Sequence, residues 1–194
     1  KTMKVAALQM VSGVALQANL DQARRLLEQA AQAGAELAVL PEYFSAMGLR
    51  DEDKLARGET PGDGPVQRFL ADAARALGLW IVGGTLPLAT GSRERVHNSS
   101  LVFSPEGACV ARYDKIHLFR FDNGREHFDE ARVIEAGTRC VHFDLPARDG
   151  RLWRVGLSVC YDLRFPELYR AHARAGADLL LVPSAFTWTT GRAH

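Results

Sequence analysis

The feature that most constrains the fold of this chain is the alternation of short apolar runs with amphipathic helical segments. An apolar run within residues 1–15 is followed by "NLDQARRLLEQAAQAGA" at 19–35, which carries apolar residues on one helical face. Asn19 and Gln22 suit a capping box at its start, and Gly34 suits its end. The run "ELAVLPEYF" then reads as a buried strand ending at Pro41. Strand, helix and strand in this order predict an α/β protein with parallel strands.

The same rhythm continues along the rest of the chain. We expect a helix over 66–78, a strand over 79–88, a hairpin over 97–115 with its turn at 105–107, strands over 138–145 and 153–159, a helix over 166–175 and a strand over 178–184. No linker or internal repeat divides the sequence. We therefore expect residues 1–194 to form a single domain.

Composition excludes several classes of protein. Lys and Arg number 24 against 23 Asp and Glu, a formal charge of +1, so neither nucleic acid nor an anionic membrane surface is an expected partner. No apolar run approaches the roughly 20 residues of a membrane span. The three cysteines have no disulfide or metal spacing, which favours the cytoplasm and predicts no metal site. No motif predicts a cofactor, so we expect a small-molecule partner.

Three predicted strands end at a reactive side chain. "AVLPE" ends at Glu42, "ARYDK" at Lys115 and "LSVC" at Cys160. Ligands of open α/β sheets bind beyond the carboxyl ends of the strands, so the three groups are candidates for one site. A thiol needs a base at neutral pH, which Glu42 can supply, while Lys115 and the backbone N–H of Tyr161 can stabilise an oxyanion.

The segment leading to Cys160 has two distinct faces. Apolar residues from Trp153 to Val159 alternate with a second set in which Gly156 and Ser158 precede the cysteine. We expect the small face to leave open space for a substrate beside the sulfur. A helix starting just past Cys160 would favour the thiolate.

Four ordered motifs carry a family resemblance. "LPEYF", "YDKIHLF", "GLSVCYDLRFPEL" and "PSAFTWTTGRAH" resemble the nitrilase superfamily of carbon–nitrogen hydrolases. The resemblance implies a four-layer α-β-β-α sandwich, with Glu42 as base, Lys115 as oxyanion stabiliser and Cys160 as the nucleophile that forms a thioester. Such proteins also carry a second glutamate, which "HFDEARVIEAG" aligns with Glu130. In the family, the last motif opens a long helix followed by further strands, so we expect a C-terminal part to be missing here.

The residues around the nucleophile indicate a branch. "CYDLRFPE" and "PSAF" resemble deaminated glutathione amidases and, as the alternative, omega-amidases acting on α-ketoglutaramate. Substrates of both carry a carboxylate beside the amide, and Arg164 is a candidate clamp for it. Tyr161 and Phe186 complete the candidate substrate-binding residues, and we expect a homodimer or larger homo-oligomer.

Other interpretations stay open at this point. His117 could replace Glu42 as the base in a Cys/His acyl hydrolase. Arg164 could be a structural ion-pair partner of Asp162 or Glu167 rather than a substrate clamp. The chain could also be a catalytically silent interaction subunit. Ammonia release from small amides separates this last reading from the enzymatic ones.

Overall fold

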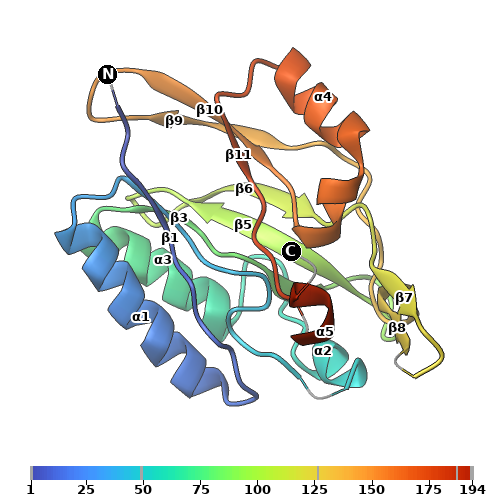
Figure 1. Cartoon of the computed structure of the whole chain (residues 1–194). Helices are drawn as coiled ribbons and strands as arrows, with labels where there is room; N and C mark the ends of the chain where they lie inside the picture. The colour runs from blue at the N-terminus through green and yellow to red at the C-terminus, as the bar shows by residue number, and fades with distance from the viewer. Residues whose placement is uncertain (1, 49, 126, 187, 193–194) are drawn as a thin grey trace.

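The computed structural model describes residues 2–48, 50–125, 127–186 and 188–192, which form two facing sheets with helices on their outer sides (Figure 1). The helices are α1 (Leu16–Gln32), α2 (Glu52–Ala56), α3 (Pro65–Leu77), α4 (Pro166–Arg174) and α5 (Trp188–Gly191), with 3₁₀ helices η1 (Glu130–Arg132) and η2 (Cys160–Arg164). The strands are β1 (Val5–Ala7), β2 (Leu37–Val39), β3 (Trp80–Val82), β4 (Leu86–Ala89), β5 (Val96–Phe103), β6 (Cys109–Asp114), β7 (Arg120–Asp122), β8 (His127–Asp129), β9 (His142–Pro146), β10 (Leu152–Leu157) and β11 (Leu179–Leu181). The predicted α-β-β-α layering is confirmed.

The first sheet contains the predicted strand–helix–strand unit. β1, β2 and β3 run parallel, with Leu37 in register with Val5 on one side and Trp80 on the other. β5 runs antiparallel to β3, β4 and β6. β6 therefore has the direction of β2, and the carboxyl ends of these two strands lie at the same end of the sheet.

The second sheet has the order β11-β10-β9. β10 pairs antiparallel with β9 and parallel with β11, and α4 makes the crossover between the two parallel strands. Two apolar clusters hold the layers together. One joins α1 and α3 to the first sheet, and the other lies between the sheets.

The two-faced pattern of β10 is confirmed, but its small face has a different purpose from the one expected. Val155 and Leu157 belong to the core between the sheets. Gly156 lies under the ring of His172, and the Ser158 hydroxyl lies 2.9 Å from that of Tyr169, both on α4. The small residues thus make room for a helix and not for a substrate, and the prediction of open space on this face is wrong.

Asn19 does not cap α1. The helix already begins at Leu16 after an Ala15 cap without a side-chain bond, so the predicted capping box is wrong. The Asn19 side chain instead bonds the backbone of Gly13 and of Ser45, and so ties the loop after β1 to the loop after β2. The stop near Gly34 is confirmed, since this residue has φ +80° just past the helix.

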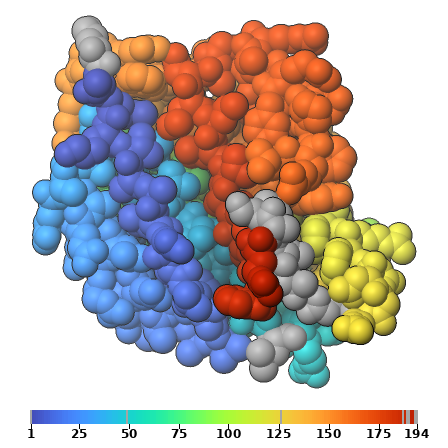
Figure 2. Space-filling model, in the orientation of Figure 1, coloured from blue at the N-terminus to red at the C-terminus, as the bar shows by residue number. Residues whose placement is uncertain are grey.

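The N-terminal segment, α5 and the β7–β8 hairpin share one face of the molecule, with α5 on its surface (Figure 2). The β7–β8 hairpin and α2 have no counterpart in the sequence prediction. None of the described helices combines the length and apolar character needed to span a membrane. Cys109, Cys140 and Cys160 are free thiols.

Candidate active site

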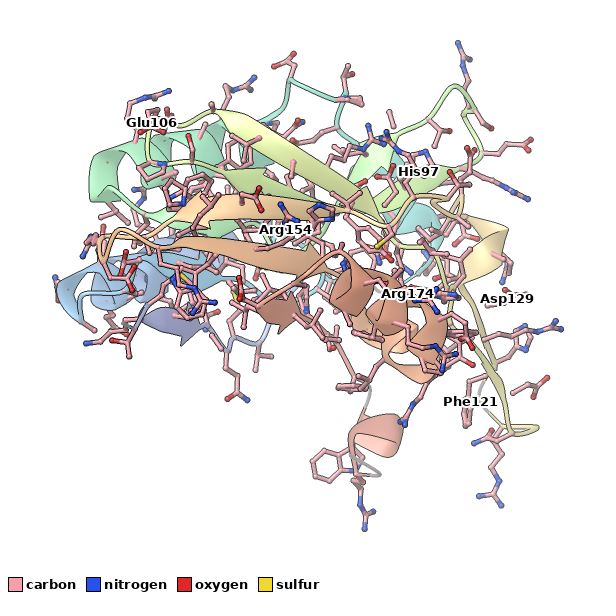
Figure 3. The ribbon with its side chains drawn as sticks, turned by 90° about the horizontal axis from the view of Figure 1, so that it is seen from above. His97, Glu106, Phe121, Asp129, Arg154 and Arg174 are labelled. Atoms are coloured by element: carbon pink, nitrogen blue, oxygen red, sulfur yellow. The ribbon has the colours of Figure 1, made fainter. Side chains whose placement is uncertain are left out.

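The candidate residues gather at one end of the first sheet. Glu106, at the turn of the β5–β6 hairpin, lies at the opposite end from His97 near the start of β5 (Figure 3). Lys115 directly follows β6, and so lies at the His97 end. Glu42 follows β2 in the same direction, and Cys160 opens η2 after β10 in the facing sheet.

Lys115 joins two glutamates inside the protein. Its Nζ donates to Glu42 Oε1 at 3.1 Å and to Glu130 Oε2 at 2.8 Å. Lys115 and Glu42 are almost fully buried, and Glu130 is only slightly exposed. Glu130 Oε2 also accepts the backbone N–H of Phe119 at 2.7 Å. The structure thus brings together Glu42, Lys115 and Glu130, which come from three separate parts of the sequence.

A break in the predicted strand 79–88 positions Glu42. The segment forms β3 and β4 with an interruption at Gly84, whose φ is +48° and where a Cβ would overlap the Pro41 carbonyl oxygen. The next residue, Thr85, accepts the Tyr43 N–H at its hydroxyl, 2.9 Å away. Tyr43 itself has φ +51°, a strained value for a bulky residue. The interruption at Gly84 and Thr85 therefore contacts the backbone on both sides of Glu42 and fixes the turn that carries it.

Two hydrogen-bond donors to Glu42 were not predicted from the sequence. Asn98 Nδ2 on β5 donates to Glu42 Oε1 at 2.9 Å, and the Ala185 backbone N–H donates to Oε2 at 3.0 Å. Asn98 is completely buried. β5 carries four polar residues in a row, His97 to Ser100, so the sequence alone does not single out Asn98. Ala185 contributes only its backbone, so its side chain gives no signal.

Cys160 occupies a strained turn facing this group. Its φ is +47°, unusual for a residue other than glycine, and its N–H donates to the Pro183 carbonyl at 3.0 Å. The thiol lies 3.9 Å from the carbonyl oxygen of Ala185. One peptide segment, 183–185, therefore contacts both the candidate nucleophile and the candidate base.

Asp162 holds the turn after Cys160. This buried carboxylate accepts the Tyr113 hydroxyl at 2.6 Å, the Val159 N–H at 2.8 Å, and His117 through both its N–H at 3.0 Å and its Nδ1 at 2.7 Å. His117 also stacks on Phe165. The described contacts of His117 are thus with a structural carboxylate and an aromatic ring, which fits support of the turn better than a role as base.

The charges of the site shift its pKa values in opposite directions. Burial raises the pKa of Glu42, Lys115 lowers it, and Glu130 raises it again. Burial opposes the charge on Lys115, but Glu42 and Glu130 outweigh it and raise the lysine pKa above its usual range. Lys115 is therefore a fixed cation, and Glu42 is a stronger base than an ordinary carboxylate.

The expected stabilisation of a resting thiolate is wrong. Burial and the charge of Glu42 raise the pKa of Cys160 to about 12, although Lys115 opposes the shift. α4 starts only at Pro166, and the residues directly after Cys160 form the short η2 instead. The thiol is protonated at neutral pH and needs a base to react.

The three candidate substrate-binding residues surround this turn at different depths. Tyr161 is half-buried, and its ring makes edge contacts with Phe119 and Phe165. Arg164 is exposed at the end of η2, and Phe186 is 48% exposed just beyond Ala185. Asp162 bonds the groups named above, and Glu167 pairs with Arg170. Thr187, Ala193 and His194 of the last motif lie outside the described residues.

The sequence of this chain is similar to those of known carbon-nitrogen hydrolases. The family model described as carbon-nitrogen hydrolase matches residues 4–193. The chain is 37% identical to a deaminated glutathione amidase of Synechocystis sp. over all of its length and 70% of the relative's. It is 35% identical to an omega-amidase of Danio rerio over 91% of its length and 61% of the relative's.

Solved structures agree with this placement. The crystal structure of Saccharomyces cerevisiae Nit3, a member of branch 10 of the nitrilase superfamily, superposes with a TM-score of 0.83 at 28% identity, covering 99% of this chain and 68% of that one. An amidase from Nesterenkonia sp. AN1 gives a TM-score of 0.80 at 26% identity, with 98% and 70% covered. Fold, site geometry and sequence similarity lead to one conclusion: the chain belongs to the carbon–nitrogen hydrolase family.

Proposed function

We propose that this protein is an amidase that cleaves the C–N bond of a small amide through a cysteine thioester and releases ammonia. The observation that carries the proposal is the double contact of Ala185, whose N–H meets Glu42 and whose carbonyl meets Cys160. Ala185 thus contacts a buried base with its N–H and a partly buried thiol with its carbonyl. Lys115 places a fixed positive charge beside Glu42.

In the first half of the reaction, Glu42 takes the Sγ proton as the sulfur of Cys160 attacks the amide carbon. The carbonyl oxygen becomes an oxyanion, which Lys115 and the Tyr161 N–H stabilise. The C–N bond then breaks, and the nitrogen leaves as ammonia with the proton held by Glu42. The enzyme is left as a thioester.

In the second half, Glu42 removes a proton from water as the water oxygen attacks the thioester. The C–S bond breaks, the sulfur regains the proton, and a carboxylic acid leaves. Glu130 orients Lys115 throughout, since it accepts a second hydrogen bond from the same ammonium. Each proton removed by Glu42 is returned to a leaving atom, so the enzyme ends the cycle unchanged.

The named relatives and the expected role of Arg164 support the proposed substrate class. Relatives of this chain are named deaminated glutathione amidase and omega-amidase. Arg164, exposed at the end of η2, is placed four residues after the thiol, where it can pair with a substrate carboxylate. We expect Tyr161 and Phe186, which flank this turn, to contact the apolar part of the substrate. We rank deaminated glutathione ahead of α-ketoglutaramate, with nitriles far behind.

We keep two further expectations as part of the proposal. Three free thiols are compatible with a reducing compartment, which supports the cytoplasm. A homodimer or larger homo-oligomer remains a prediction, which light scattering of the purified protein tests.

The deciding experiment is ammonia release from a panel of deaminated glutathione, α-ketoglutaramate, a neutral aliphatic amide and a nitrile. Cys160→Ala is the inactive comparison and Cys109→Ala the matched control, because Cys109 lies on β6 as an exposed thiol. Turnover of the carboxylate-bearing amides that Cys160→Ala abolishes supports the proposal. Preference for the nitrile overturns the substrate class, and absence of all turnover favours the silent interaction subunit.

A further inference from the structure

Asn98 contacts both the candidate base, Glu42, and its charged partner, Lys115. Its side-chain Nδ2 donates to Glu42 Oε1 at 2.9 Å, and its backbone carbonyl accepts the Lys115 N–H at 2.9 Å. The same Glu42 oxygen receives the Lys115 ammonium. Asn98 therefore fixes the carboxylate through its side chain and the start of the lysine through its backbone.

The nitrogen and the oxygen of the Asn98 side-chain amide differ in their hydrogen bonding. Nδ2 is bonded to the carboxylate, while Oδ1 is buried with no hydrogen-bond partner among the described residues. A hydrogen bond to a charged group is stronger than one between neutral groups, whereas an unpaired buried oxygen costs stability. An apolar residue would remove that cost, so stability alone does not explain an asparagine here.

The remaining contacts leave Glu42 little freedom. Oε2 is held by the Ala185 N–H at 3.0 Å, and Oε1 is held by Asn98 and Lys115. These donors come from three different parts of the fold. Loss of the Asn98 donor leaves Oε1 with Lys115 alone, which the mechanism also needs for the oxyanion.

We propose that Asn98 is a positioning residue for the reaction, which holds Glu42 ionised and oriented so that Lys115 is free to serve the oxyanion. The inference rests on the proposed amidase function and extends it to a residue whose side-chain amide donates to the candidate base. Its action on the reaction passes through Glu42.

The charges around Glu42 support the direction of this effect. Burial and Glu130 raise the Glu42 pKa, whereas Lys115 and the Asn98 hydrogen bond lower it. Cys160 and Tyr43 are the other titratable groups nearby, and the pKa of each is raised mainly by burial, so both are neutral at neutral pH. Without Asn98, Glu42 should bind its proton at higher pH.

The test compares Asn98→Leu, which has a similar volume but no donor, with Ser100→Ala as the matched control. Ser100 is fully buried on the same strand and the same face, and its hydroxyl has no hydrogen-bond partner in the described part of the chain. We expect Asn98→Leu to move the acidic limb of the kcat/KM profile upward by about one pH unit or more. Thermal unfolding should change little, and Ser100→Ala should leave the limb in place. A folded Asn98→Leu protein with an unmoved acidic limb overturns the inference.

A measurement on the unmodified protein covers the case in which Asn98→Leu fails to fold. The side-chain amide protons of Asn98, followed by NMR, should titrate with the midpoint of the acidic limb, and this titration should vanish in Glu42→Gln. Amide protons that do not respond to pH contradict the inference. If the wild-type protein releases no ammonia while the amide still titrates, the proposed function fails and the contact survives.

Discussion

The backbone N–H of Ala185 donates to Glu42 Oε2 at 3.0 Å across 143 residues of sequence. The carbonyl of the same residue lies 3.9 Å from the Cys160 sulfur. A single residue after β11 therefore sets the spacing between the candidate base and the candidate nucleophile. Movement of this segment would change both contacts at once.

Replacing Glu42 by glutamine should remove the base while keeping its shape. The glutamine amide cannot take a proton from the thiol. Its NH₂ group must also face a hydrogen-bond donor, because both oxygens of Glu42 accept hydrogen bonds. We expect kcat/KM for ammonia release to fall by about 10²–10⁴-fold. Glu94→Gln, at an exposed glutamate, should keep wild-type activity. A Glu42→Gln enzyme of near-normal rate would eliminate Glu42 as the base.

The pH dependence should reflect the raised pKa of Glu42. Protonated Glu42 cannot accept the thiol proton, so activity should be lost at low pH and rise as pH passes a midpoint above the ordinary glutamate value of about 4.3. Because the Cys160 pKa is about 12, no alkaline limb from the thiol should appear near neutrality. His117→Gln is the control, and it should leave the midpoint unchanged. A midpoint that disappears in this variant would establish the Cys/His mechanism instead.

The ends of the strands could be predicted from sequence, but the contacts between them could not. Period-two patterns locate where β6 and β10 stop. Because the carboxyl ends of parallel strands lie at the same edge of a sheet, the proximity of Glu42 and Lys115 is predictable. The Ala185 contact is made by the backbone and has no sequence signal. The role of Gly156 depends on the helix that packs against it, and the thiol pKa depends on burial, which sequence alone does not give.

Lys115 should be needed for stability as well as activity. Lys115→Met leaves Glu42 and Glu130 buried without their shared cation, and breaking such a group costs about 3–5 kcal/mol. Without the cation that lowers it, the Glu42 pKa should rise further, so protonation of Glu42 should favour folding of the variant. The variant should regain stability as pH falls through this pKa and lose it as pH rises.

Urea unfolding of Lys115→Met at pH 5 and pH 8 measures this. Lys54→Met is the control, because Lys54 pairs with Asp51 near the surface and should contribute about 1 kcal/mol or less. If Lys115→Met loses equal stability at both pH values, the buried carboxylates are not the cause. A variant as stable as the wild type would contradict the buried ion pair itself.

Thiol labelling should distinguish a base-assisted cysteine from an acidic one. Iodoacetamide should label Cys160 faster than Cys109 or Cys140 only while Glu42 is present to take the proton, because the pKa of Cys160 is raised to about 12. Peptide mapping of wild type and Glu42→Gln measures each site. Cys109 and Cys140 are the internal controls and should react equally in both proteins. Undiminished labelling of Cys160 in Glu42→Gln would mean that the thiol needs no help from this carboxylate.

Arg164 should decide between charged and neutral amides. If its guanidinium pairs with a substrate carboxylate, Arg164→Met should raise KM for α-ketoglutaramate by roughly ten- to a hundredfold, as expected for a lost charge-assisted pair. A neutral aliphatic amide lacks the carboxylate, so its KM should barely change. Arg170→Met is the matched control, since Arg170 is an exposed arginine on α4 paired with Glu167, and neither KM should change there. Equal losses on charged and neutral amides would assign Arg164 to the structure of η2, because damage to the turn after Cys160 affects every substrate alike.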